Sequence, residues 1–185
     1  PKAQPGEETT PRILDAADAL FARDGLHGVT LKAVAKEAGV DTALLHYYFD
    51  DKNRLFSTVF GRRAEVVNKL RLDSLERYEA EHGDAMTIGG AIDAFLRPLF
   101  LLFDADNKAW LNYAALVAQV NNTPVWCGDT MHQHFDPVID RFIGVLKRIA
   151  PDTPPRQIYW FYHLLSGALT LSLAQTGRID VLSGG

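Results

Sequence analysis

Residues 29–49 read VTLKAVAKEAGVDTALLHYYF, and this segment is the strongest indication of the fold. Apolar residues recur at helical spacing before and after Gly39, so a short helix is predicted on each side of that glycine. Glycine permits the positive φ of a tight turn, and alanines keep the first helix slim where the second packs against it. Thr30 and Asp41 are side chains that cap helix N-termini. The segment therefore predicts a helix-turn-helix unit.

An apolar stripe in residues 11–25 predicts a further helix before this unit. Thr10 and Pro11 suit its start, because threonine caps a helix and proline loses nothing at the first helical position. Gly25 suits its end. The three helices form a predicted headpiece over residues 1–51. Val40, Leu44 and Leu45 are predicted to lie in its core. The outer face of its last helix then consists of Thr42, Ala43, His46 and Tyr47.

Helical periodicity continues through the rest of the chain, and no segment alternates convincingly with period two. A long helix is expected from Lys52 to about Glu81. Later helices are expected near residues 88–103, 107–121, 129–149 and 155–176, with limits at clusters of turn-forming residues. The predicted class is all-α, with a second helical domain over residues 52–185.

Composition is that of an ordinary globular protein, with 47% hydrophobic and 23% charged residues. The net charge is -4, and residues 1–63 carry nine basic and nine acidic side chains, so any case for nucleic acid must come from motif geometry. The single cysteine, Cys127, excludes an intrachain disulfide. No signal peptide is recognised, and apolar runs such as Leu99–Phe103 fall far short of the ~20 residues that span a bilayer, which predicts a cytoplasmic protein without membrane contact.

Several short elements follow one another at fixed spacing from Pro11 to Phe56: ILDAA at 13–17, LFARDG at 20–25, VT at 29–30, AGV at 38–40 and HYYF at 46–49, with Lys52 after them. This pattern resembles the headpiece of the TetR (tetracycline repressor) family of transcription regulators. The resemblance implies a helix-turn-helix headpiece on a helical domain that binds ligand and forms a homodimer. It also implies a regulator without cofactor, a repressor released from palindromic double-stranded operator DNA by a largely apolar small molecule.

The resemblance assigns DNA-binding roles residue by residue. Phosphate contacts fall to Thr30, Lys32 and Lys52, and Thr42, Ala43 and Leu44 occupy the turn that approaches the bases. His46 suits a base edge or a phosphate, and Tyr47 and Tyr48 suit the DNA backbone.

Other roles for these side chains stay open. Tyr47 and Tyr48 also fit as covers of the small core, and His46 also fits as a solvated surface residue. Arg62 and Arg63 fit either the DNA flanks or a solvated helix face. Two departures from the family pattern are the acids Asp41, Asp50 and Asp51 beside a face for a polyanion, and Leu44 where many members have a small polar residue.

Aromatic residues crowd the second domain, where a bundle core explains most of them. Some alternate with polar side chains, as in a small-molecule pocket, and Pro98 predicts a kink in an apolar helix. By family resemblance, the predicted ligand-binding residues are Phe95, Phe103, Trp110, Tyr113, Val117 and Trp126. His163 is added as a polar side chain among apolar ones. The helix at 157–176 mixes small and large apolar residues, which suits close packing in a dimer. The family resemblance implies that this helix and the one near 135–149 form the dimer interface.

Rival functions lack support in the sequence. His132 and His134 point about 200° apart on a helix and cannot easily share a metal ion, and no third ligand stands out near His132 and Asp136. No metal is therefore predicted. A phosphate-binding loop, a nucleophile elbow and a base partner for Cys127 are not found, so an enzyme is not predicted. A purely structural helical adaptor would not need the outward Thr30, Tyr47 and Lys52.

Overall fold

The computed structural model describes residues 5–103, 107–123, 129–174 and 176–184. These residues form helices and contain no strand, which confirms the predicted all-α class. In chain order the helices are α1 (Pro5–Gly28), α2 (Leu31–Ala38), α3 (Thr42–Phe49), α4 (Lys52–His82), the 3-10 turn η1 (Gly83–Ala85), α5 (Ile88–Leu102), α6 (Lys108–Asn121), α7 (Asp129–Ile149), α8 (Pro155–Leu173) and α9 (Arg178–Ser183).

Local capping explains why α2 and α3 begin and end where the sequence predicts. The Thr30 Oγ1 accepts a hydrogen bond from the Ala33 amide at 3.1 Å, and the Asp41 carboxylate accepts one from the Ala43 amide at 2.7 Å. Between the helices Gly39 adopts the left-handed conformation, with φ 65° and ψ 40°. The predicted helix-turn-helix is confirmed.

Replacing Gly39 with alanine is expected to lower the free energy of unfolding by about 1 kcal/mol, because the left-handed region penalises a Cβ atom. A Cβ built at Gly39 meets no atom within 4 Å, so the penalty is confined to the backbone. Urea denaturation measures the change. Asparagine tolerates the left-handed region better, so Gly39→Asn should lose less stability. Equal losses in the two variants would contradict the backbone explanation.

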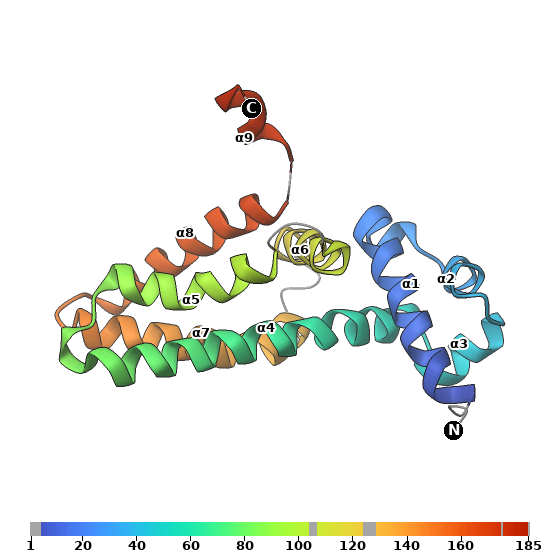
Figure 1. The fold of residues 1–185 in the computed structure, drawn as a ribbon, viewed down its shortest axis with the longest axis horizontal. Helices are drawn as coiled ribbons and strands as arrows, with labels where there is room; N and C mark the ends of the chain where they lie inside the picture. The colour runs from blue at the N-terminus through green and yellow to red at the C-terminus, as the bar shows by residue number, and fades with distance from the viewer. Residues whose placement is uncertain (1–4, 104–106, 124–128, 175, 185) are drawn as a thin grey trace.

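The headpiece core continues into the first turns of α4. Phe21 of α1 packs edge-on against Phe56 of α4, with ring centroids 5.1 Å apart, and Phe56 stacks on Phe60 one turn later. Leu45 of α3 and Leu55 of α4 are fully buried in the same core. The headpiece is thus fastened to the long helix that leads into the rest of the chain (Figure 1).

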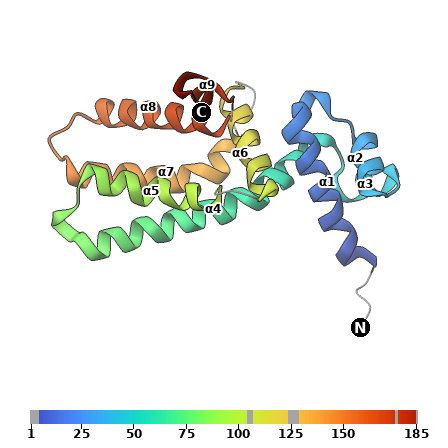
Figure 2. The same cartoon turned by 45° about the horizontal axis from the view of Figure 1, so that its top comes forward.

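Helices α4 to α8 form an elongated bundle (Figures 1 and 2), and α9 projects from it in Figure 1. Helix α4 packs against α5 and α7, and α8 packs against α6 and α7. Helix α6 also packs against α1, so it lies between the bundle and the headpiece. None of the described helices is long and apolar enough to cross a membrane.

Three boundaries differ from prediction. Helix α1 begins at Pro5 rather than after Thr10, so that Pro11 lies inside the helix and not at its first position. Gly25 breaks the helix as predicted, with φ 68° and ψ 173°, but helical residues resume up to Gly28. Helix α9 was not predicted; Gly177, which was expected to end the chain's last helix, caps its start instead.

Candidate functional site

Helix α3 presents a mixed polar surface to solvent. Leu45 and Phe49, one turn apart, face the core, while Ala43, His46 and Tyr47 are exposed and Thr42 is half-buried. The prediction that Leu44 faces the core is wrong: its side chain is half-buried. The inward face of so short a helix is filled by Leu45 and Phe49, and the neighbouring position lies about 100° away at its edge.

The two tyrosines of α3 have different surroundings. Tyr47 is 80% exposed, so it does not cover the core. Tyr48 is half-buried and packs against the core beside Phe49, with ring centroids 6.2 Å apart. The rings of Tyr47 and Tyr48 meet edge to face at 5.4 Å. Tyr48 therefore supports the orientation of the Tyr47 ring, whose hydroxyl faces solvent.

His46 is fixed by the end of its own helix. Its Nδ1 lies 3.1 Å from the Asp50 carbonyl oxygen, which can only accept, so Nδ1 carries the hydrogen. In its neutral form the ring presents Nε2 as an acceptor on the exposed face of α3.

A second group of side chains gathers at the start of α2. The Lys52 ammonium donates a hydrogen bond at 3.0 Å to the carbonyl oxygen of Val29, the residue before Thr30. Lys32 is exposed in the first turn of α2, and the Thr30 oxygen that caps this turn retains its own hydrogen for donation. Two amines, a hydroxyl and a helix N-terminus therefore lie together, a combination that favours phosphate.

The acids near this face have structural partners. Asp41 caps α3, and Asp51 caps α4 by accepting from the Arg54 amide at 2.8 Å. Asp50 forms an exposed ion pair with Arg54 at 3.2 Å. Capping explains the presence of Asp41 and Asp51 beside a basic site, and the ion pair with Arg54 partly neutralises Asp50. Arg54 is a cation in the first turn of α4 that the sequence analysis did not single out.

Arg62 and Arg63 join α4 to α1, and the burial of Arg63 excludes the solvated helix face as the role of that residue. Arg62 pairs with Asp15 at 2.8 Å on the surface. Arg63 pairs with the buried Asp18 at 3.2 Å and lies over the Trp110 ring, 5.3 Å from its centroid. Burial outweighs the attraction of Arg63 and raises the pKa of Asp18 above its ordinary value.

A cavity of about 60 Å³ lies within the bundle and is lined by side chains from α4 to α8. It contains four of the predicted ligand-binding residues, namely Phe95, Phe103, Tyr113 and Val117. It also contains polar groups that the sequence analysis missed, among them Arg71, Asn121, Tyr162 and Ser166. Arg71 was detectable in principle, because it occupies the buried stripe of α4 between Val67 and Leu75 at four-residue spacing.

Two other predicted ligand-binding residues, Trp110 and His163, do not line this cavity. Trp110 packs against Tyr113 and Arg63 at the joint between α6 and α4. His163 is exposed beside Trp160, since the cavity faces the side of α8 that carries Tyr162 and Ser166. Trp126 lies outside the described residues.

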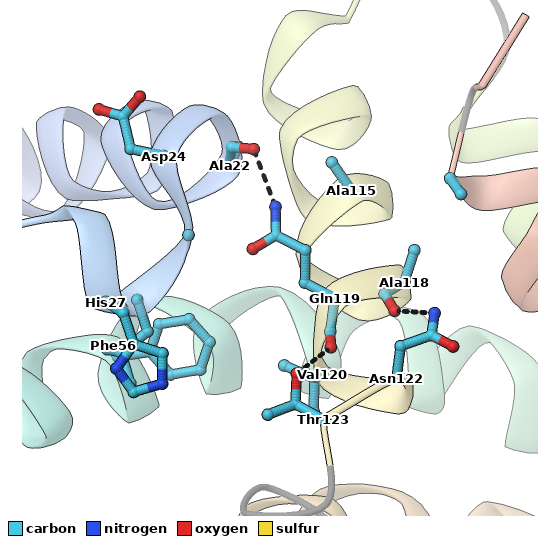
Figure 3. Close-up of a pocket in the computed structure, with 13 residues that line it drawn as sticks. Ala22, Asp24, His27, Phe56, Ala115, Ala118, Gln119, Val120, Asn122 and Thr123 are labelled. Carbon is cyan, nitrogen blue, oxygen red and sulfur yellow. Dashed lines mark hydrogen bonds between the residues drawn. The ribbon is translucent and has the colours of Figure 1, made fainter.

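A wider groove of about 600 Å³ is lined by residues at the end of α1 and by residues of α6. Figure 3 shows Gln119 reaching across it, where its Nε2 donates to the Ala22 carbonyl oxygen at 3.0 Å. On α6, Tyr113 and Val117 face the bundle cavity and Gln119 faces the headpiece. A displacement of α6 would therefore reach α1 directly.

No group of three or more potential metal ligands gathers among the residues that the structure describes. The pair considered in the sequence, His132 and Asp136, forms a surface contact at 2.8 Å.

The chain matches two family models. Residues 13–59 match the one described as bacterial regulatory proteins, tetR family. Residues 93–185, half of the chain, match the one described as tetracyclin repressor-like, C-terminal domain.

Individual relatives are similar over part of their length. The HTH-type transcriptional regulator AcrR of Shigella flexneri is 33% identical over 86 residues, 46% of this chain and 38% of that protein. The biofilm operon icaADBC negative regulator IcaR of Staphylococcus aureus is 26% identical over 114 residues, 61% of this chain and 54% of that protein. The chain thus spans about half the length of these relatives, or less. A mutant form of HlyIIR shares the fold, with a TM-score of 0.62 over 95% of this chain and 90% of that chain at 22% identity.

Proposed function

The chain belongs to the TetR family of bacterial regulatory proteins, and from this premise we propose that it is a dimeric repressor released from operator DNA by a small molecule. The family and the similar proteins are transcriptional regulators, not enzymes. The observation that carries the proposal is the outward face of α3, the helix that follows the Gly39 turn, on which Tyr47 is 80% exposed. A function on DNA would place the protein in the bacterial cytoplasm.

In the proposed complex α3 enters the major groove. Thr42, Ala43 and Leu44 in its first turn approach base edges, and His46 accepts from a base amino group through Nε2. Phosphates on either side are held by Thr30 and Lys32 at the start of α2, by Lys52, and by the Tyr47 hydroxyl. Tyr48 acts by supporting Tyr47, since it is half-buried.

Dimer formation is supported by an exposed apolar stripe on α8. Trp160, Leu164 and Leu171 are all more than half exposed, and their spacing of four and seven residues places them on one face. An exposed stripe of this kind is typical of a surface that meets another protein. A two-fold pairing through it would set two α3 helices about 34 Å apart on a palindromic site.

Release by a ligand is supported by the two faces of α6. One face lines the bundle cavity and the other bonds the headpiece through Gln119. A ligand that prefers a wider cavity would shift α6, and with it the angle of the headpiece. Shifting the equilibrium enough to free the DNA requires a difference in affinity between the two states of about 1–3 kcal/mol or more.

Selection of bound fragments from a genomic library tests DNA binding, and fluorescence anisotropy then measures affinity. Tyr47→Ala and Tyr47→Phe should both weaken binding roughly tenfold or more at every selected site, because a hydrogen bond to a phosphate is lost. Unfolding free energies should stay unchanged, since the side chain is exposed. Failure to select any fragment, or wild-type affinity in both variants, would contradict the proposed interface.

Lys52→Gln is expected to reduce the slope of log affinity against log salt by about 0.9, because one phosphate contact is removed. Glutamine retains an N–H donor for the Val29 carbonyl oxygen that Lys52 now bonds, so the fold should be preserved. Lys36, an exposed lysine of α2, provides the matched control, and Lys36→Gln should leave the slope unchanged. Equal slopes in the two variants would mean that Lys52 does not contact a phosphate.

A further inference from the structure

The bundle cavity contains a buried cation. Arg71 is 4% exposed, and within the described part of the chain it has no carboxylate partner. Its Nε donates to the Phe95 carbonyl oxygen at 3.0 Å, and its guanidinium lies 3.6 Å from the centroid of the Phe95 ring. A carbonyl dipole and an aromatic face stabilise a cation only partly. The remaining N–H groups of the guanidinium are available to an anion.

A second donor in the cavity also lacks a partner. Tyr113 is 1% exposed, and its hydroxyl has no hydrogen-bond partner among the described residues. Burial raises the pKa of Tyr113 far above its ordinary value and lowers the pKa of Arg71 to about 10. At neutral pH the phenol is therefore a neutral donor and the guanidinium stays charged. Unsatisfied buried donors are expensive, which favours an acceptor from outside the chain.

The remaining walls are mostly apolar, with Leu99, Val117, Phe135 and Leu169 among them. A ligand complementary to these side chains has an apolar body and one anionic end. A carboxylate matches the fork of a guanidinium in two parallel hydrogen bonds and brings one negative charge to one positive charge. A phosphate dianion would leave a charge uncompensated in a site of low dielectric constant.

We propose that the bundle cavity binds an organic monocarboxylic acid, with its carboxylate on Arg71 and the Tyr113 hydroxyl and its apolar body among the side chains of α5 to α8. This inference rests on the proposed function, because the acid would be the effector of the repressor. The cavity of about 60 Å³ is smaller than the 300–1,000 Å³ typical of ligand sites. Binding therefore moves its walls apart, α6 included.

Calorimetry on the whole 185-residue chain tests the site. The probes are octanoate, decanoate and phenylacetate, and the matched neutral compounds are octanol, decanol and 2-phenylethanol. At least one acid should bind roughly tenfold or more tightly than its alcohol. Arg71→Met should still bind the alcohol but no longer prefer the acid. Arg71→Lys should retain part of the preference for the acid. Tyr113→Phe should lower the affinity for the acid and leave the affinity for the alcohol unchanged. Thermal denaturation checks that each variant folds.

Several results would overturn the site. They are no binding of any acid to the wild type, equal affinities for each acid and its alcohol, or an undiminished preference in folded Arg71→Met. If that variant does not fold, an undiminished preference in Tyr113→Phe has the same consequence. DNA release is measured separately by anisotropy on a selected operator. An acid that binds without releasing DNA contradicts the effector role and leaves the site intact, and failure to bind DNA contradicts the proposed function alone.

Discussion

Replacing Arg63 with methionine is expected to lower the free energy of unfolding by about 3 kcal/mol at neutral pH, because the carboxylate of Asp18 would stay buried without its cation. Asp18 is 2% exposed, and Arg63 is the cation that pairs with its carboxylate. Methionine keeps most of the apolar volume of the arginine side chain. Urea denaturation measures the loss.

The neighbouring arginine provides the control. Arg62 forms a similar pair with Asp15 at 2.8 Å, but the Asp15 side chain is largely exposed. Exposed pairs contribute at most about 1 kcal/mol, so Arg62→Met should change stability little. The double variant Asp18→Asn/Arg63→Met should recover part of the loss, because it removes both buried charges. Equal losses in the two arginine variants would mean that burial of the pair is unimportant.

The loss in Arg63→Met should depend on pH. The folded pKa of Asp18 is raised above its unfolded value by burial, so its contribution to stability is present below about pH 3.9 and is lost as pH rises through the folded pKa. Removing Arg63 raises the folded pKa further, since the attraction of Arg63 lowers it. The difference between variant and wild type should be small near pH 4 and grow toward pH 7. A difference in unfolding free energy that grows toward acidic pH would contradict the assignment of this effect to Asp18.

The parts of the fold that follow from sequence are those that depend on local chemistry. Thr30, Gly39 and Asp41 fix the ends of α2 and α3 through contacts within a few residues, and all three were predicted. Leu44 was placed wrongly because the inward face of α3 depends on how α3 meets its neighbours.

The interior of the bundle was less predictable, since its contacts join distant residues. Gln119 bonds Ala22 at a separation of 97 residues, and Arg71 bonds Phe95 at a separation of 24. Periodicity identifies the helices and their apolar faces but not which faces meet. Four aromatic or aliphatic cavity residues were predicted, whereas the buried cation among them was not.

Leu164→Glu is expected to convert the protein to a monomer and to weaken binding to a palindromic operator by roughly 100-fold or more, because the second headpiece then no longer binds at a high effective concentration. Leu164 lies on the apolar stripe of α8 and is 69% exposed. In a two-fold interface each substitution occurs twice, so two glutamates would be brought into one apolar contact. Sedimentation measures the assembly and anisotropy the affinity.

Leu101 of α5 is the matched control, since it is also 69% exposed but lies off the α8 stripe. Leu101→Glu should remain a dimer with wild-type affinity. DNA with a single half-site should bind Leu164→Glu and wild type alike, because α3 is untouched and only the coupling between headpieces is lost. A dimeric Leu164→Glu would exclude the α8 stripe as the interface. An equal loss on the half-site would mean that the substitution acts through the headpiece instead.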